Sequence, residues 1–251
     1  MQIRTARRAL LKLGLVLLAT PASLRANAQQ RRPAGVVELF TSQGCSRCPP
    51  ADKLFIGLAE RDDLVALAYH VDYWDYLGWK DQLATRANTD RQNAYGEAFD
   101  VAVYTPQAVI NGRRNVIGSD RDGIAAMLQP DGADGLTADV SLSSNGPNIA
   151  IDIGEGEVQA PGAHVILVYY QPRQLVEIAG GDNEGKVIDY RNIVRSYQTL
   201  GVWHGKPMRL ELPRSEVEKK GGHFAVLIQA FDRDGRPGRI LGATRTGYDL
   251  G

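Results

Sequence analysis

The chain contains only two cysteines among its 251 residues, Cys45 and Cys48. A structural zinc site normally requires four ligands, so a single cysteine pair argues against one. Other soft-metal ligands are scarce, because the chain has three methionines and no cysteine-rich or methionine-rich segment. Three of the four histidines, His164, His204 and His223, have no acidic residue or cysteine close to them in the sequence. We therefore expect no resident metal ion and no cofactor.

The chain also lacks a long apolar run. Its N-terminal apolar stretch, Leu10–Ala19, is shorter than the ~20 residues of a membrane-spanning helix and contains Lys12. It follows a basic segment, Met1–Arg8, and precedes Ala26-Asn27-Ala28, which fits an A-x-A cleavage site. These features predict a signal peptide over residues 1–28 and an exported protein, periplasmic or secreted. An uncleaved membrane anchor is the alternative; after cleavage we expect no stable membrane span.

Charge of one sign is not in excess either. Basic and acidic side chains number 29 each, and the predicted signal peptide contains five of the basic ones and none of the acidic ones. The mature chain would then have 24 basic and 29 acidic side chains, a net charge of −5. A mildly acidic protein gives no support for binding to nucleic acid or to anionic membranes. Export also matters for the cysteines, because an oxidised pair persists outside the cytosol.

The two cysteines lie in Val36–Asp52, which reads V-V-E-L-F-T-S-Q-G-C-S-R-C-P-P-A-D. Its apolar start, Val36–Phe40, predicts a short strand. Pro49-Pro50 fits the first turn of a helix, where an N–H has no intrahelical partner. The helix then has an apolar stripe with the spacing i, i+3, i+4, i+7, i+8, formed by Ala51, Leu54, Phe55, Leu58 and Ala59. A strand, a C-x-x-C motif and a helix in this order resemble the thioredoxin-like fold.

The position of the cysteines at the start of a helix favours redox chemistry. The helix N-terminus and the neighbouring Arg47 both favour a thiolate, so Cys45 is the candidate nucleophile. Cys48 lies one turn further along and can resolve a mixed disulfide. An inert disulfide is the alternative, although a two-residue spacer closes a loop too short to gain much chain-entropy stabilisation.

One carboxylate interrupts the predicted strand. Glu38 lies within V-V-E-L-F, where burial without a partner costs free energy. In thioredoxin-like proteins a carboxylate on this strand can lie beneath the cysteines and exchange protons with the resolving thiol. A raised pKa would suit Glu38 to this catalytic role. The alternative is that Glu38 pairs with a basic residue or points to a solvated edge.

A second strand, Leu64–Val71, is a nearly continuous apolar run, which is typical of a strand covered on both faces. With the first strand and the helix it predicts a βαβ unit with parallel pairing and a right-handed crossover. Ligands of open α/β sheets bind beyond the carboxyl ends of such strands. The segment after the second strand lies there, so we expect it to line the site with His70, Asp72 and Trp74. The alternative is that its aromatic residues pack a loop and its acids cap the next helix.

The remaining elements of this half are one or two helices, a hairpin with an Asn111-Gly112 turn, and a closing helix capped by Ser119 or Asp120. They are predicted at Leu83–Phe99, Ala108–Asn111, Asn115–Gly118 and Asp120–Leu128. Thioredoxin-like folds have a cis-proline just before this hairpin, facing the cysteines. The resemblance therefore assigns a cis bond to Thr105-Pro106, with Pro106 shaping the catalytic site and Thr105 contacting the substrate.

The periodicity changes after the turn-rich segment 129–136, Q-P-D-G-A-D-G-L. Six short runs with alternating or apolar character follow, which predict an antiparallel sheet or sandwich. The expected architecture is an α/β thioredoxin-like domain at 29–130 followed by a β-rich domain at 137–251. Within the latter, Gly180–Gly185 and Tyr190–Arg195 predict a long hairpin with a solvated tip; the alternative is a loop that folds back over Cys45.

Four motifs in order along the chain together resemble the DUF1223 family, exported bacterial proteins of thioredoxin-like fold. They are V-V-E-L-F-T-S-Q-G-C-S-R-C-P-P-A-D, H-V-D-Y-W-D-Y-L-G-W-K-D, Y-T-P-Q-A-V-I-N-G and G-D-N-E-G-K-V-I-D-Y-R-N-I-V-R. The resemblance extends from Val36 to Arg195 and implies a redox role without naming a substrate. Gly44 stands where thioredoxins usually have tryptophan, so their redox potential does not carry over.

Three functions fit these features, and we favour the first. It is a thiol-disulfide oxidoreductase that acts on protein or small-molecule thiols and disulfides through Cys45 and Cys48, with Glu38 or Asp72 moving protons. The second is a Cu(I)-binding protein that uses the same thiolates, with His70 as a third ligand. The third is a non-catalytic binding module with a structural disulfide, in which the β-rich half binds a protein or an envelope component.

Overall fold

The computed structural model describes residues 32–128, 135–159 and 161–246. The predicted signal peptide and residues 129–134 of the predicted boundary lie outside the described residues. Within the described ranges, no helix is both long and apolar enough to span a membrane.

The first half of the described chain alternates strands and helices, as the sequence predicts. In chain order it consists of β1 (Gly35–Thr41), α1 (Pro49–Ala59), β2 (Leu64–His70), η1 (Asp75–Leu77), α2 (Arg86–Phe99), β3 (Gln107–Ile110), β4 (Arg114–Ile117) and α3 (Arg121–Met127). Parallel pairing of β1 with β2 is confirmed, in register from Gly35 opposite Leu64 to Thr41 opposite His70. Both strands are buried throughout, because α1 and α3 cover one face of the sheet and α2 covers the other.

The local signals of this half are also confirmed. The hairpin of β3 and β4 turns at Asn111 and Gly112, both with positive φ (51° and 62°), and the Arg113 N–H donates to the Ile110 carbonyl oxygen at 3.0 Å. Asp120 caps α3, because its carboxylate accepts a hydrogen bond from the Gly123 N–H at 2.9 Å.

The second half is rich in antiparallel strands, as predicted, and it contains the predicted long hairpin, whose second strand extends further than the sequence indicated. Its elements are β5 (Val140–Asn145), β6 (Asn148–Ile153), β7 (Ala163–Glu177), η2 (Gly181–Asn183), β8 (Val187–Trp203), β9 (Met208–Pro213), α4 (Arg214–Lys219), β10 (Phe224–Phe231) and β11 (Pro237–Arg245). The sequence of β8 mixes polar and apolar residues with no period of two. It forms a strand because it pairs with β7 along nearly its whole length.

Strands from both halves belong to one eight-stranded sheet, in the order β11-β10-β7-β8-β2-β1-β3-β4. The halves join where β8 lies parallel to β2, with Ile193 opposite Ala68. Asn192 has a positive φ of 46° there, and its side-chain amide donates to the Ala66 carbonyl oxygen at 2.9 Å. The predicted thioredoxin-like and β-rich regions therefore share a sheet.

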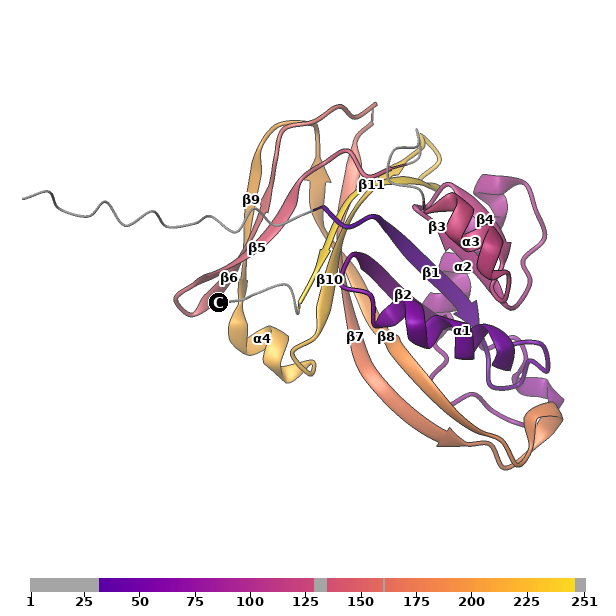
Figure 1. Ribbon diagram of the computed structural model, residues 1–251. Helices are drawn as coiled ribbons and strands as arrows, with labels where there is room; N and C mark the ends of the chain where they lie inside the picture. The colour runs from indigo at the N-terminus through magenta and orange to yellow at the C-terminus, as the bar shows by residue number, and fades with distance from the viewer. Residues whose placement is uncertain (1–31, 129–134, 160, 247–251) are drawn as a thin grey trace, which may run out of the picture.

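The predicted sandwich is formed by a second sheet of three strands, β5-β6-β9, packed against the far part of the large sheet. Side chains from both sheets, including Leu142, Ile151, Val165 and Phe224, form one buried apolar cluster. Figure 1 shows this small sheet at one end of the molecule and the helices α1, α2 and α3 at the other. The long β7–β8 hairpin extends beneath α1, toward the segment that contains the cysteines.

Candidate active site around the Cys45–Cys48 disulfide

Cys45 and Cys48 form a disulfide, with their Cα atoms 5.4 Å apart. Cys48 is the N-cap of α1, and Pro49 is the first residue of the helix, as predicted. Both cysteines are buried, with exposed fractions of 1% for Cys45 and 0% for Cys48. Ser46 and Arg47 between them are exposed. Solvent therefore reaches the spacer but not the cysteine side chains.

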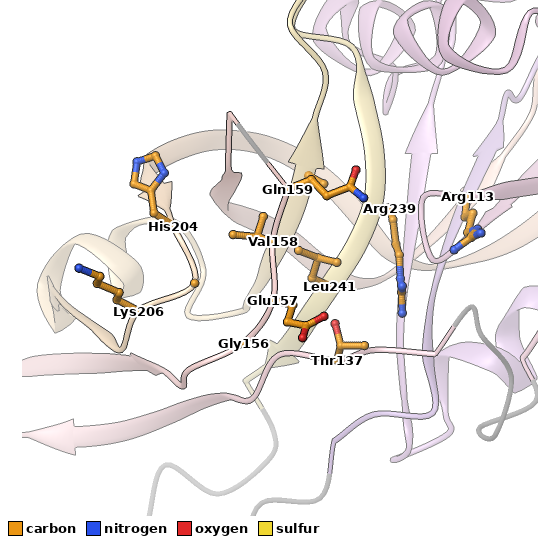
Figure 2. A pocket seen from close by; sticks show the side chains of 12 residues that line it. Arg113, Thr137, Gly156, Glu157, Val158, Gln159, His204, Lys206, Arg239 and Leu241 are labelled. Carbon is orange, nitrogen blue, oxygen red and sulfur yellow. The ribbon is translucent and has the colours of Figure 1, made fainter.

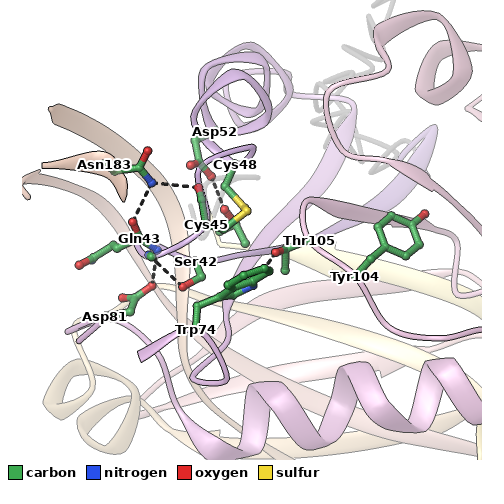
Figure 3. The surroundings of a disulfide bond; sticks show 12 residues. Ser42, Gln43, Cys45, Cys48, Asp52, Trp74, Asp81, Tyr104, Thr105 and Asn183 are labelled. Atoms are coloured by element: carbon green, nitrogen blue, oxygen red, sulfur yellow. Dashed lines mark hydrogen bonds between the residues drawn. A yellow bond between two sulfur atoms is a disulfide. The ribbon is translucent and has the colours of Figure 1, made fainter. Parts of the chain in front are cut away.

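A buried carboxyl group lies one turn after Cys48 on the same helix. Asp52 accepts a hydrogen bond from the Thr41 hydroxyl at 2.7 Å through Oδ1, and its Oδ2 is buried with no partner among the described residues. Burial raises the pKa of Asp52 to about 7, against the opposing effects of the His70 charge and the Thr41 hydrogen bond. Figure 3 shows Asp52 beside Cys48. A carboxyl group with this pKa can give or take a proton at neutral pH.

Asp52 was missed by the sequence analysis, which assigned the proton-transfer role to Glu38 or Asp72. The sequence spacing between Cys48 and Asp52 could have identified it. Asp52 follows Cys48 by four residues, and positions i and i+4 share a helix face. It also lies between Ala51 and Phe55, which are buried.

Glu38 lies on the other face of the sheet. Its neighbour Leu39 packs with Phe55 of α1, and successive side chains of a strand point to opposite faces. Glu38 itself accepts hydrogen bonds from α2, through Oε1 from Arg91 Nε at 2.7 Å and through Oε2 from the Tyr95 hydroxyl. The alternative interpretation, pairing with a basic residue, is confirmed. This geometry gives Glu38 a structural partner and leaves Asp52 as the carboxyl group nearest in the chain to the cysteines.

The Arg91 side chain connects the two halves of the protein. It donates to the Gln229 side-chain oxygen of β10 at 2.9 Å, and its guanidinium carbon lies 5.2 to 5.7 Å from the ring centres of Tyr69, Tyr95 and Tyr197. A buried ion pair offsets its desolvation cost only when further hydrogen bonds satisfy both charges. These contacts supply them, so the ion pair stabilises the packing of α2 on the sheet.

His70, expected to contact the substrate, is fully buried and paired with Asp81. His70 Nδ1 lies 2.8 Å from Asp81 Oδ2, which also accepts the Gln43 N–H at 2.9 Å; Oδ1 accepts the Leu83 N–H at 2.8 Å. Burial alone would raise the pKa of Asp81, but His70 and the two amides outweigh it and hold that pKa below its usual value. The pair therefore fixes the backbone of Gln43, two residues before Cys45.

The other predicted site residues separate into two groups. Asp72 is turned toward α2, where its Oδ1 accepts a hydrogen bond from the Thr89 hydroxyl at 2.6 Å. Trp74 and Thr105 meet at the disulfide, with the indole N–H donating to the Thr105 hydroxyl oxygen at 2.8 Å (Figure 3). The Thr105-Pro106 peptide bond is cis, as the resemblance predicted.

Pro106 lies beside the first turn of α1. A Cβ atom placed on Gly118 would be 3.1 Å from the Pro106 Cβ and 3.3 Å from the Ala51 Cβ. Since Ala51 is three residues after Cys48, the cis-proline and the cysteine helix are neighbours. Glycine at position 118 is what allows this close approach.

The tip of the β7–β8 hairpin contributes a residue that the sequence analysis did not identify. Asn183 is buried, and its side-chain amide donates to the carbonyl oxygens of Gln43 at 2.8 Å and Cys45 at 2.9 Å (Figure 3). The prediction of a solvated tip holds for Asp182 and Glu184, which are exposed, and is wrong for Asn183. The alternative, a loop that folds back over Cys45, is confirmed.

A separate cavity of about 1090 Å³ lies near the start of β11, lined by residues of the second half and by Arg113 of the β3–β4 turn. Figure 2 shows Arg113 and Arg239 on one side of it and His204 and Lys206 on the other, with Glu157 between. None of its lining residues belongs to the disulfide site. Elsewhere in the described chain, no group of three or more His, Cys, Asp or Glu side chains is placed to hold a metal ion.

Comparisons with other proteins place these features in a family. The chain is 43% identical to protein AGR_C_4864 from Agrobacterium tumefaciens, whose crystal structure it matches with a TM-score of 0.76 over 86% of this chain and 94% of that one. HBP35 of Porphyromonas gingivalis has a similar fold at 13% identity, with a TM-score of 0.57 over 85% of this chain and 74% of that one. No protein with a curated description matches the chain. A family model for proteins of unknown function matches residues 36–229, and the chain belongs to that family, DUF1223.

Proposed function

We propose that the protein is a thiol-disulfide oxidoreductase built on a thioredoxin-like unit and that its Cys45–Cys48 pair cycles between disulfide and dithiol. The observation that carries this proposal is the position of Asp52, a buried carboxyl group with a pKa of about 7, one helical turn after Cys48. A disulfide that only braces the fold has no need of a proton donor beside it. An exchange catalyst needs one at each turnover, because a thiolate must form and be protonated.

Two further observations support a thioredoxin-like unit in the first half. The disulfide lies at the N-terminus of α1, between the parallel strands β1 and β2 of a βαβ unit. The cis-proline Pro106 approaches the same helix from the loop before β3. The Cys45–Cys48 disulfide and the cis-proline Pro106 therefore both lie at the N-terminal end of α1, the helix that connects β1 to β2.

The geometry suggests how exchange proceeds. The thiolate of a substrate attacks Cys45 Sγ, a mixed disulfide forms, and the Cys45–Cys48 bond breaks. Cys48 leaves as a thiolate and is protonated by Asp52. In the reverse direction Asp52 takes the proton from Cys48, which attacks the mixed disulfide and releases the substrate thiol. One disulfide is lost and one is formed, so no other oxidant or reductant is required.

The proposal includes the compartment and the partners. Export through residues 1–28, to the periplasm or by secretion, would place the pair where an oxidised state persists. The partners would be protein or small-molecule thiols and disulfides. The proposed partners include neither nucleic acid nor a membrane.

The test is exchange with glutathione by the mature protein and three variants. Cys48→Ser should accumulate a mixed disulfide with glutathione at Cys45, visible by mass spectrometry. Cys45→Ser should lose exchange activity, and the cysteine-free double variant serves as the control. A reduction potential above roughly −200 mV would fit an exchange catalyst. If both single variants keep full activity, the proposal fails.

A second candidate function has one specific observation in its favour. Both cysteines are buried, with Cys48 at 0% exposure, and burial slows thiol exchange. A non-catalytic binding module with a structural disulfide would show a potential below roughly −300 mV and no mixed disulfide. The same glutathione experiment therefore separates the two candidates.

A further inference from the structure

The disulfide is covered by the protein itself on two sides. One cover is the hairpin tip around Asn183, which comes from the second half of the chain. The other is Trp74, from the segment after β2. In the segment from Ser42 to Cys48, the exposed residues are Ser46 and Arg47.

Both polar atoms of the Asn183 side chain are hydrogen-bonded. Its side-chain nitrogen donates to the carbonyl oxygens of Gln43 and Cys45, and its side-chain oxygen accepts a hydrogen bond from the Lys186 ammonium group at 2.7 Å. One of these carbonyl groups belongs to Cys45 itself and the other to Gln43, two residues before it. A partner that approached along this edge would find both acceptors already occupied.

The tip is also seated against the segment after β2. A Cβ atom on Gly181 would lie 3.1 Å from the Trp79 Cβ and 3.2 Å from the Leu77 carbonyl oxygen, so the two backbones are in close contact. The indole N–H of Trp79 donates to the Gln43 side-chain oxygen at 2.8 Å. The hairpin tip and the segment after β2 thus both contact the cysteine segment at Gln43.

Trp74 closes the opposite side. A Cβ atom on Gly44 would lie 3.1 Å from the Trp74 Cβ and 3.2 Å from its carbonyl oxygen. The indole N–H is bonded to the hydroxyl of Thr105, the residue before the cis-proline. The polar groups on both edges of the disulfide are therefore engaged within the chain.

We propose that the Cys45–Cys48 pair exchanges with low-molecular-weight thiols and disulfides rather than with cysteines of folded proteins, and that Asn183 and Trp74 determine this specificity. This inference rests on the proposed function. When a folded protein presents a cysteine, the residues on either side of that cysteine must also contact the surface around the disulfide. Asn183 and Trp74 already occupy this surface. A small thiol requires only a local opening at the exposed Ser46 and Arg47 to reach the Cys45 sulfur, which is 1% exposed.

The chemical step balances with a small thiol alone. The first thiolate attacks Cys45, breaks the Cys45–Cys48 bond and forms a mixed disulfide. The second attacks the sulfur of the bound small thiol, which releases a small-molecule disulfide and the Cys45 thiolate. Two thiols lose two electrons and two protons, and the cysteine pair gains them.

The test compares two reductants on the oxidised protein, dithiothreitol and a reduced folded dithiol protein such as thioredoxin. Each rate is normalised to the reduction of insulin by the same reagent. We expect the wild type to react with dithiothreitol and to resist the protein. In Asn183→Ala the ratio of the protein rate to the dithiothreitol rate should rise roughly tenfold, the change expected when the hairpin tip loses its two hydrogen bonds to the Gln43 and Cys45 carbonyl oxygens and opens more often.

Two further variants keep the test decisive. Trp74→Ala opens the other edge and should raise the same ratio independently. Glu177→Ala changes an exposed residue near the end of β7 and should leave the ratio as in the wild type. If the wild type is reduced by the protein as readily as Asn183→Ala is, the specificity proposal is overturned. If Cys48→Ser forms no mixed disulfide with glutathione, the proposed function itself fails, which is a different result.

Discussion

The backbone N–H of Asp52 donates to the carbonyl oxygen of Cys48 at 3.0 Å, so the two residues lie one turn apart on the same face of α1. The helix therefore holds a carboxyl group beside the second cysteine without any contribution from the rest of the fold. The surrounding sheet contributes the burial that raises the pKa of this group to about 7. The local sequence therefore determines where the Asp52 carboxyl group lies, and tertiary packing determines its pKa.

The raised pKa of Asp52 predicts how stability depends on pH. In the unfolded chain this carboxyl group ionises near its usual value of 3.8, whereas in the folded protein it ionises at about 7. Between these values the folded state holds one more proton, so its stability falls as pH rises and the loss is complete above about 7. The loss amounts to roughly 4 kcal/mol. Urea unfolding of the oxidised protein from pH 4 to pH 8 measures it.

Asp52→Asn removes this titration. The variant should lose less stability than the wild type between pH 4 and pH 8 and should be the more stable of the two at pH 8. Asp122→Asn, at an exposed position in the first turn of α3, is the matched control and should follow the wild-type curve. Parallel curves for wild type and Asp52→Asn would show that the folded Asp52 does not titrate near neutral pH.

The same group predicts the pH dependence of resolution. When Cys48 attacks a mixed disulfide at Cys45, ionised Asp52 takes its proton, so the rate of the wild type should rise with pH to a plateau above about 7. In Asp52→Asn, Cys48 must ionise unaided, and the rise should move toward the usual thiol pKa of about 8.5. Single-turnover release of glutathione from the preformed mixed disulfide measures this rate. Identical profiles for the two proteins would assign proton transfer to another group.

A third prediction concerns the buried ion pair of Glu38 and Arg91. Arg91→Leu leaves the Glu38 carboxylate buried without its charged partner and should lower the free energy of unfolding by about 3–5 kcal/mol. Adding Glu38→Gln removes the unpaired charge and should recover part of this loss. Chemical denaturation of the single and double variants measures both. Glutathione exchange by Glu38→Gln should match the wild type at temperatures where both are folded; a variant that is stable but inactive would restore a catalytic role for Glu38.

The first half could be predicted from the sequence because its signals are local. The Pro49-Pro50 start of α1, the apolar run of β2 and the Asn111-Gly112 turn each specify an element without reference to distant residues. The local sequence does not show which face of the sheet a polar residue points to, or what covers that face. Glu38 faces Arg91 because α2 covers that face, and the order of the helices around the sheet decides this.

The second half was harder to predict because its structure depends on pairing. β8 has no alternation of its own and is held between β7 and β2, with Asn192 bridging to Ala66 where the pairing with β2 is short. The role of Asn183 depends on the same pairing. Only after β7 and β8 are paired does the hairpin extend far enough to place Asn183 on Gln43 and Cys45, 140 and 138 residues away in the sequence.

The contact between the cis-proline and the cysteine helix can be tested at Gly118. A Cβ atom there would lie 2.6 Å from a methyl group of Leu39 as well as against Pro106 and Ala51, so Gly118→Ala forces one of these groups to move. Overpacking of this kind costs about 1–3 kcal/mol. The displaced groups include both sides of the site, so the variant should also change the rate of exchange with glutathione. Thermal unfolding and the exchange assay measure the two effects.

Gly57→Ala is the matched control for that substitution. Gly57 is exposed within α1, and a Cβ atom there meets nothing within 4 Å. Alanine in a helix interior is favoured over glycine by roughly 0.5–1 kcal/mol, so this variant should be more stable than the wild type and equally active. If Gly118→Ala instead behaves like Gly57→Ala, with higher stability and unchanged exchange, Pro106 is not packed against the cysteine helix in solution. Its part in shaping the site would then have to be abandoned.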